Sequence, residues 1–156
     1  MKYLVVFYSR TGVTRLVGEK LANLLSCVSE EILDTKKRKG PIGYITSGRE
    51  AVYKSLTKLE PQQNNPQDFD LVIIGTPVWA WDISTPIRTY LENNRGNFKK
   101  VAFFCTMQGS GDNQAYKTMI EICEQEPIAT LSLLTKKVLK DKNEKNLKNF
   151  IEKIKI

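Results

Sequence analysis

Three hydroxyl side chains and a glycine lie close together near the start of the chain. Residues 8–14 read YSRTGVT and directly follow an apolar run. The hydroxyls of Ser9, Thr11 and Thr14 can donate hydrogen bonds to an anion, and Gly12 lets a ligand approach the backbone closely. The segment is neither GxxxxGK[ST], the triphosphate loop, nor GxGxxG, the pyrophosphate loop of NAD and FAD proteins. It therefore predicts a cradle for one phosphate.

The helix expected after this segment strengthens that prediction. A helix that begins at Gly12 or Val13 directs unpaired N–H groups and the positive end of its dipole toward the segment. A cluster of Ser and Thr at a helix start also serves as a plain cap, so the cluster alone leaves both interpretations open.

Two further segments combine aromatic, hydroxyl and glycine residues. Residues 76–82 read TPVWAWD and contain both tryptophans of the chain, whereas residues 106–112 read TMQGSGD. Each of them follows an apolar run that is typical of a buried strand. With two tryptophans facing the helix start from the next segment, phosphate binding is favoured over a plain cap.

The elements that position these segments alternate between strand and helix. Apolar runs predict strands at 3–8, 30–33, 71–75, 101–105 and 128–134. Helical spacing of apolar residues, with capping signals, predicts helices at 13–25, 47–59, 85–91, 112–123 and 147–154. Five β-α repeats predict an α/β fold with a parallel sheet. Ligands of such sheets bind beyond the carboxyl ends of the strands, where the three segments would meet.

The segment between the second strand and the second helix is the least regular part of the chain. Residues 34–46 show no periodicity and are expected to form a loop. Ser47 and Glu50 have the spacing of a capping box, so we expect the helix to begin there.

Composition excludes several classes of protein. The 156 residues are expected to form a single domain, 1–156, and no apolar stretch approaches the roughly 20 residues of a membrane span. The first apolar run is too short for a signal peptide, which favours a cytoplasmic location. The chain has no histidine, which excludes His-based triads, and its three cysteines form no CxxC pair. We expect no metal site and no catalytic side chain, and Cys105 is interpreted as a small buried residue.

The net charge of +7 raises nucleic acid as a partner. The positive charge is concentrated at 36–39 (KKRK) and in the lysine-rich stretch 136–155, and no nucleic-acid-binding motif accompanies it. Solvated basic surfaces are the favoured interpretation, and no nucleic-acid partner is expected.

The three segments resemble those of flavodoxins. Residues 9–14 are similar to the phosphate loop [ST]-x-T-G-x-T of that family, residues 75–79 (GTPVW) resemble its first flavin loop, and 109–111 (GSG) lie where its second flavin loop follows. The resemblance covers the whole chain. It implies a flavodoxin-like three-layer sandwich whose five-stranded parallel sheet has the order 2-1-3-4-5, with helices on both faces, and it implies FMN as the cofactor.

The resemblance also implies which residues bind FMN. Trp79 matches the tryptophan that stacks on the flavin ring, whereas Trp81 has no match and is left open between flavin contact and packing. The implied cofactor-binding residues are Ser9, Arg10, Thr11, Gly12, Val13, Thr14, Thr76, Pro77, Val78, Trp79, Ala80, Trp81, Thr106, Met107, Gln108, Gly109, Ser110, Gly111 and Asp112.

The chain departs from the family pattern in several places. Ala80 stands where the family often has glycine, and Met107 and Gln108 stand where an aromatic residue often covers the flavin. The stretch 40–44 (GPIGY) is close to one in a subset of flavodoxin-like proteins, but the sequence assigns no role to it. Flavodoxins that carry electrons are usually acidic, whereas this chain is basic.

These features lead to two functional hypotheses. The favoured one is a low-potential electron carrier that docks on redox partner proteins, which the basic surface predicts to be acidic. The alternative is an FMN-dependent NAD(P)H reductase that acts on a quinone or similar acceptor. Receiver domains and low-mass phosphatases are set aside, because Gly75 and Ser9 stand where those classes need aspartate and cysteine. No membrane partner is expected, and the sequence leaves a monomer and a homodimer both open.

Overall fold

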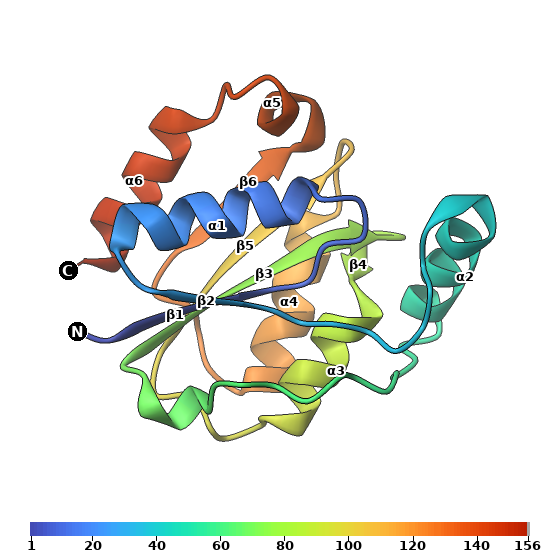
Figure 1. Ribbon diagram of the computed structural model, residues 1–156, viewed down its shortest axis with the longest axis horizontal. Helices are drawn as coiled ribbons and strands as arrows, with labels where there is room; N and C mark the ends of the chain where they lie inside the picture. The colour runs from blue at the N-terminus through green and yellow to red at the C-terminus, as the bar shows by residue number, and fades with distance from the viewer. Residues whose placement is uncertain (156) are drawn as a thin grey trace.

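The computed structural model describes residues 1–155 and contains a central parallel sheet (Figure 1). The sheet order is β2-β1-β3-β5-β6, which confirms the predicted order 2-1-3-4-5 of the five long strands. A two-residue strand, β4, pairs antiparallel with the end of β3 and was not predicted. The strands are β1 (Tyr3–Phe7), β2 (Val28–Glu31), β3 (Leu71–Trp79), β4 (Asp82–Ile83), β5 (Val101–Met107) and β6 (Thr130–Leu134).

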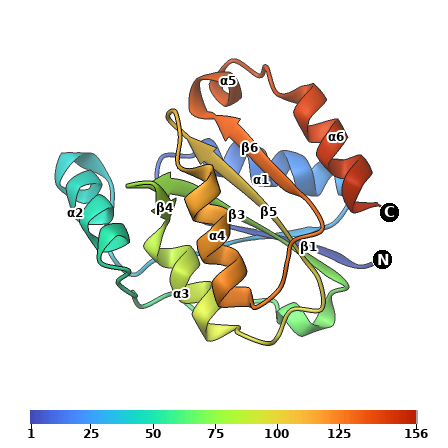
Figure 2. The same ribbon diagram turned by 180° about the vertical axis from the view of Figure 1, so that it is seen from behind.

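Helices cover both faces of the sheet (Figures 1 and 2). One face carries α1 (Val13–Leu25), α5 (Thr135–Leu139) and α6 (Glu144–Ile154). The other carries α3 (Thr85–Asn93) and α4 (Asp112–Cys123), and the short η1 (Pro66–Asp68) precedes β3. Within the part of the chain that the structure describes, no helix has the length and apolar character needed to cross a bilayer.

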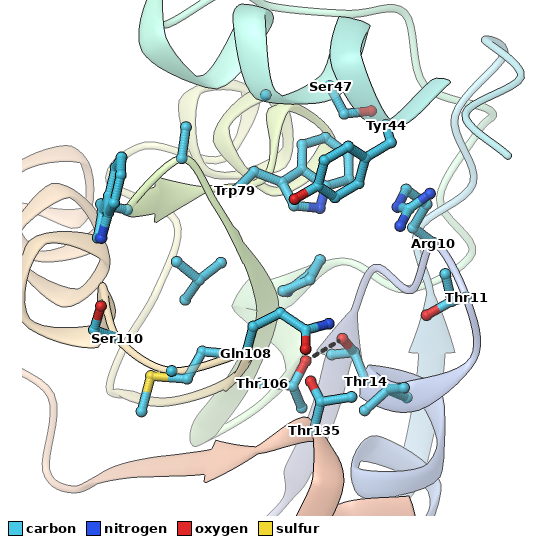
Figure 3. A pocket seen from close by; sticks show the side chains of 18 of the residues that line it. Arg10, Thr11, Thr14, Tyr44, Ser47, Trp79, Thr106, Gln108, Ser110 and Thr135 are labelled. Carbon is cyan, nitrogen blue, oxygen red and sulfur yellow. Dashed lines mark hydrogen bonds between the residues drawn. The ribbon is translucent and has the colours of Figure 1, made fainter. Parts of the chain in front are cut away.

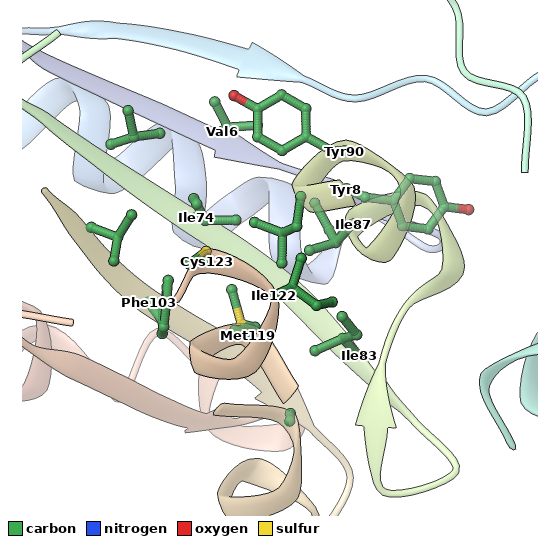
Figure 4. Packing of buried hydrophobic residues seen from close by; sticks show 14 of the residues in the cluster. Val6, Tyr8, Ile74, Ile83, Ile87, Tyr90, Phe103, Met119, Ile122 and Cys123 are labelled. Atoms are coloured by element: carbon green, nitrogen blue, oxygen red, sulfur yellow. The ribbon is translucent and has the colours of Figure 1, made fainter. Parts of the chain in front are cut away.

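The central strands are apolar throughout because both of their faces are covered. Successive side chains of a strand point to opposite faces, so Val5 and Ile73 join the core under α1, whereas Val6 and Ile74 join the core under α3 and α4. All four side chains are fully buried. Figure 4 shows the second core, in which Met119 of α4 packs near Ile74.

The helix α2 (Gly40–Val52) corrects the prediction for residues 34–50. The helix begins at Gly40 with a proline in its first turn, so Ser47 lies inside the helix and does not cap it. The buried face of α2 consists of Gly43, Ser47 and Ala51, and a Cβ on Gly43 would lie 2.2 Å from the Arg38 carbonyl oxygen. Because α2 packs through small residues, the sequence lacks the apolar period that marks most helices.

The length of β3 corrects the prediction that this strand ends at residue 75. The strand continues to Trp79, and Ala80 and Trp81 then adopt positive φ angles of 47° and 64°. Two successive positive φ angles are the signature of a tight hairpin turn, which usually contains asparagine or glycine. Each non-glycine residue in this conformation costs about 1 kcal/mol, so surrounding contacts must hold the turn in place.

Candidate functional site

A cavity of ≈ 600 Å³ opens at the carboxyl ends of β1, β3 and β5 (Figure 3). All three segments singled out in the sequence contribute to its wall, as does α2. From those segments the lining residues are Arg10, Thr11, Val13, Thr14, Pro77, Val78, Trp79, Ala80, Trp81, Thr106, Met107, Gln108, Gly109 and Ser110.

The N-terminus of α1 forms one end of the cavity and is not capped by a side chain. The Oγ of Ser9 accepts a hydrogen bond at 3.0 Å from the N–H of Gly12, the residue before the helix, so it does not cap the N–H groups of the first turn. Gly12 is the N-cap residue with φ 99°, and the first turn contains no acidic side chain. The first N–H groups of the helix therefore remain available to an anion, supported by the helix dipole.

Hydroxyl groups line the wall beside this helix start. The Oγ1 atoms of Thr14 and Thr106 lie 2.8 Å apart and share a buried hydrogen bond between α1 and β5. Thr135, the first residue of α5, lies next to this pair, and Gln108 points toward it (Figure 3). Thr135 was not predicted as a site residue, because a lone threonine between a strand and a short helix has no recognisable sequence signal.

The two tryptophans occupy different positions on the cavity wall. Trp79 is only 8% exposed, and its ring meets the Tyr8 ring edge-on with a centroid distance of 5.5 Å. Trp81 is 68% exposed at the rim. The structure thus distinguishes a buried indole from a rim indole. Stacking of Trp79 on a ligand remains a prediction.

A buried ionic network lies behind Trp79. Arg38, which is 3% exposed, pairs with Asp34 and with Glu50 at 2.7 Å, and it donates to the Ser47 hydroxyl at 3.3 Å. Burial alone would lower the pKa of Arg38, but its hydrogen bonds to the two carboxylates outweigh burial and raise it. Glu50 stays ionised, because Lys36 and Arg38 lower its pKa against the effect of burial. The network fastens α2 to the segment 34–38 that precedes it.

Five predicted site residues lie outside the cavity lining, and the structure gives several of them a supporting role. Thr76 is fully buried, and its Oγ1 accepts a hydrogen bond from the Ser84 N–H at 3.0 Å. A Cβ on Gly111 would lie 2.7 Å from a Val78 methyl group, so only glycine lets the third segment pack so closely against the second. Direct contact between these five predicted site residues and a ligand stays a prediction. The five are Ser9, Gly12, Thr76, Gly111 and Asp112.

The helix α2 supplies the part of the cavity wall that sequence reasoning missed. Its residues at the cavity are Tyr44, Ile45, Ser47, Gly48, Arg49 and Val52. The guanidinium carbon of Arg10 lies 5.2 Å from the centre of the Tyr44 ring, which links α2 to the first segment. The stretch 40–44 was the only sequence signal for this wall.

Cys105 is fully buried within β5, two residues before the strand ends, and the expected burial is confirmed. Burial raises the pKa of its thiol to about 11. A thiol with that pKa is protonated at neutral pH and is a poor nucleophile. The structure therefore supports a packing role for this residue.

Comparisons with known proteins agree with this geometry. A family model described as Flavodoxin matches residues 2–154. None of the curated proteins compared with the chain matches it significantly.

Solved structures with the same fold include two flavoproteins and a flavodoxin. The flavoprotein of Lactobacillus acidophilus NCFM in complex with FMN has a TM-score of 0.71 and 22% identity, and the match covers 89% of this chain and 97% of that one. A flavoprotein of Bacteroides uniformis ATCC 8492 has a TM-score of 0.70 and 23% identity, covering 89% and 96%. Flavodoxin 1 of Bacillus cereus has a TM-score of 0.60 and 14% identity, covering 99% and 98%. Since the family model spans nearly the whole sequence, the chain belongs to the flavodoxin family.

Proposed function

We propose that the protein binds one FMN in the cavity and carries electrons between redox partner proteins. Membership of the flavodoxin family supports FMN as the cofactor. One observation supports the cavity as the place where FMN binds. The cavity extends from an uncapped helix start, which suits a phosphate, to two tryptophans, which suit a planar ring. Bound FMN would supply one- and two-electron transfer, and the protein would supply orientation and charge.

The phosphate would lie at the N-terminus of α1. Thr11, whose side chain is not engaged in a hydrogen bond within residues 1–155, would donate to it together with the free N–H groups of the first turn. Arg10 lies at the same end of the cavity and would add a positive charge. A single such cradle favours a mononucleotide over a dinucleotide.

The flavin ring would lie against Trp79, whose other contacts hold it rigidly. A buried indole loses little freedom when a ligand stacks on it, because its rotamer is already fixed by packing. Met107 and Gly109 come from the opposite segment and would bound the other side of the ring.

Electron carriage is favoured over catalysis on a small substrate because of the surface around the cavity. Exposed positive charge close to the cavity mouth suits acidic protein partners, which long-range attraction would steer toward the flavin. The second candidate is an FMN-dependent NAD(P)H reductase. The observation in its favour is the apolar outer wall made by Tyr44, Ile45 and Val52, which could accept an aromatic acceptor.

Steady-state assays of the FMN-loaded protein separate the two functions. The carrier proposal expects rapid electron exchange with a small redox protein and negligible NADH or NADPH oxidation in the presence of a quinone. Multiple-turnover NAD(P)H oxidation that saturates with quinone would favour the reductase. Protein that takes up no FMN from solution would exclude both.

A further inference from the structure

We infer that the segment 36–58, with α2 at its centre, is the docking surface for the acidic redox partner. This inference rests on the proposed function and adds the place and the residues through which the partner is recognised. Three observations carry it: exposed apolar side chains, an excess of positive charge, and a location at the cavity mouth.

The apolar side chains of this segment are unusually exposed. Ile42 is 82% exposed, Tyr53 71% and Ile45 69%, and they share the segment with Tyr44, Val52 and Leu56, each of them more than half exposed. Monomeric proteins seldom expose large apolar side chains in such a group, and where they do, the group usually marks an interaction site. Tyrosine is also among the residues enriched at the energetic centres of interfaces.

The charge of the segment identifies the kind of partner. Residues 36–58 contain seven lysines and arginines and one carboxylate, Glu50, which gives a net charge of +6 in a chain whose net charge is +7. Arg38 is neutralised inside the buried network by Asp34 and Glu50, and the exposed Lys36 pairs with Glu50 at the edge of that network.

The remaining cations of the segment face solvent. Within residues 1–155 no ion pair involves Lys37, Lys39, Arg49, Lys54 or Lys58. An apolar centre with an uncompensated basic border is complementary to a protein whose apolar contact patch is bordered by carboxylates.

The location connects docking with electron transfer. Six residues of α2 line the cavity, so a partner seated on the outer side of the helix reaches the cavity mouth. Trp81, 68% exposed, also lines the cavity and adds an exposed aromatic ring to its rim. Figure 1 shows α2 at the far side of the molecule from α6, whose lysines form a second basic surface. The two basic surfaces can therefore be tested separately.

The test follows electron transfer from an acidic plant-type [2Fe–2S] ferredoxin, a low-potential one-electron protein. Chemically reduced ferredoxin is mixed anaerobically with the FMN-loaded protein in a stopped-flow instrument. Two ferredoxins each lose one electron, and one FMN gains two electrons and takes up protons from solvent. The second-order rate constant is read from the bleaching of flavin absorbance at several ionic strengths.

Two triple variants with the same net charge separate the surfaces. Replacing Lys37, Lys39 and Lys54 with glutamate should lower the rate constant by about 10- to 100-fold at low ionic strength, with the difference shrinking as salt rises. The matched control replaces Lys142, in the turn before α6, and Lys145 and Lys153 of α6 with glutamate, and it should lower the rate constant less than threefold. Equal losses in the two variants, or no loss in the first, would overturn the inference.

A second pair of variants tests the apolar centre. Ile42→Ser with Tyr53→Ser lies outside the cavity lining and should lower the rate constant about tenfold at every ionic strength, whereas the control Ile128→Ser with Leu139→Ser should leave it unchanged. Sedimentation must show both pairs and the parent protein as monomers. A parent dimer that Ile42→Ser with Tyr53→Ser dissociates would assign this surface to a second copy of the chain and overturn the inference.

Docking can also be measured without the flavin. Calorimetric titration of the FMN-free protein with oxidised ferredoxin should give the same order among the variants. If FMN fails to bind but this order holds, the proposed function fails while the docking surface stands. If FMN binds but all variants bind ferredoxin alike, only the docking surface is refuted.

Discussion

The guanidinium carbon of Arg38 lies 5.3 Å from the centre of the Trp79 ring, so a buried cation supports the indole at the cavity wall. Asp34 and Glu50 hold that cation in place. The contact joins the irregular segment before α2 to the end of β3, and it couples the stability of this region to the shape of the cavity.

Arg38→Met should therefore destabilise the protein. The substitution keeps most of the side-chain volume but leaves two carboxylates without their buried partner, and breaking a buried pair typically costs about 3 kcal/mol or more. Urea denaturation should show the loss as a lower free energy of unfolding. Lys54→Met, on an exposed lysine, should change it by less than about 0.5 kcal/mol. Equal stability of the two variants would show that the network does not fasten α2.

The two tryptophans should respond differently to truncation. Trp79→Ala should weaken FMN binding and restore flavin fluorescence more than Trp81→Ala does, because a stacked indole quenches flavin emission and contributes about 1 kcal/mol beyond area burial. Trp79→Ala should also lower the melting temperature, since the ring is buried. Trp79→Phe keeps an aromatic face and should recover most of the affinity. A larger fluorescence change in Trp81→Ala than in Trp79→Ala would show that the flavin lies at the rim beside Trp81.

Thr11→Ala should separate the phosphate from the rest of the ligand. Loss of a hydrogen bond to a charged group costs about 1.5–3 kcal/mol, so FMN affinity should fall at least tenfold while riboflavin affinity changes little. Thr130→Ala, on an exposed threonine at the opposite edge of the sheet, is the matched control and should affect neither ligand. The cradle would be misplaced if Thr11→Ala weakened both ligands equally.

Stability should decline at alkaline pH. Burial raises the pKa of Tyr8 to about 12, of Cys105 to about 11 and of Cys123 to about 12. In the unfolded chain the cysteines ionise near their ordinary pKa of 9.0 and the tyrosine near 10.0. Between these pKa values and the raised ones, the folded state binds more protons than the unfolded state, so stability falls as the pH rises. The melting temperature should thus be level between pH 7 and 9 and fall from pH 9 to 12.

Core variants test the origin of that alkaline decline. Cys105→Ala combined with Cys123→Ala should make the fall shallower, whereas Cys27→Ala, on a partly exposed thiol, should alter it less. A melting temperature that stays level up to pH 11 would contradict the assignment.

The sheet and most of its helices were predictable from the sequence because their apolar patterns are strong. Apolar runs such as 71–75 predict strands that are buried on both faces, and 71–75 forms the first part of β3. The predicted helices at 13–25 and 112–123 agree with α1 and α4. The three segments of the cavity followed from topology, since carboxyl ends of parallel strands meet at one edge.

The contribution of α2 could not be predicted for physical reasons. Its contact face uses Gly43, Ser47 and Ala51, so no apolar stripe marks the helix, and its apolar residues point outward instead. Ser47 and Glu50 have the spacing of a capping box, but in the structure both residues contact Arg38 instead. That interaction depends on tertiary structure and cannot be inferred from local spacing. The positive φ angles of Ala80 and Trp81 were equally unforeseen, because neither residue type favours them.

The most direct test of the central claim is a fluorescence titration of the FMN-free protein with FMN and, separately, with riboflavin. We expect one FMN to bind per chain, its emission to be strongly quenched, and its affinity to be at least 100-fold higher than that of riboflavin. Equal affinity for the two ligands, or no quenching at saturation, would contradict a flavin held by its phosphate at α1 and by its ring at Trp79.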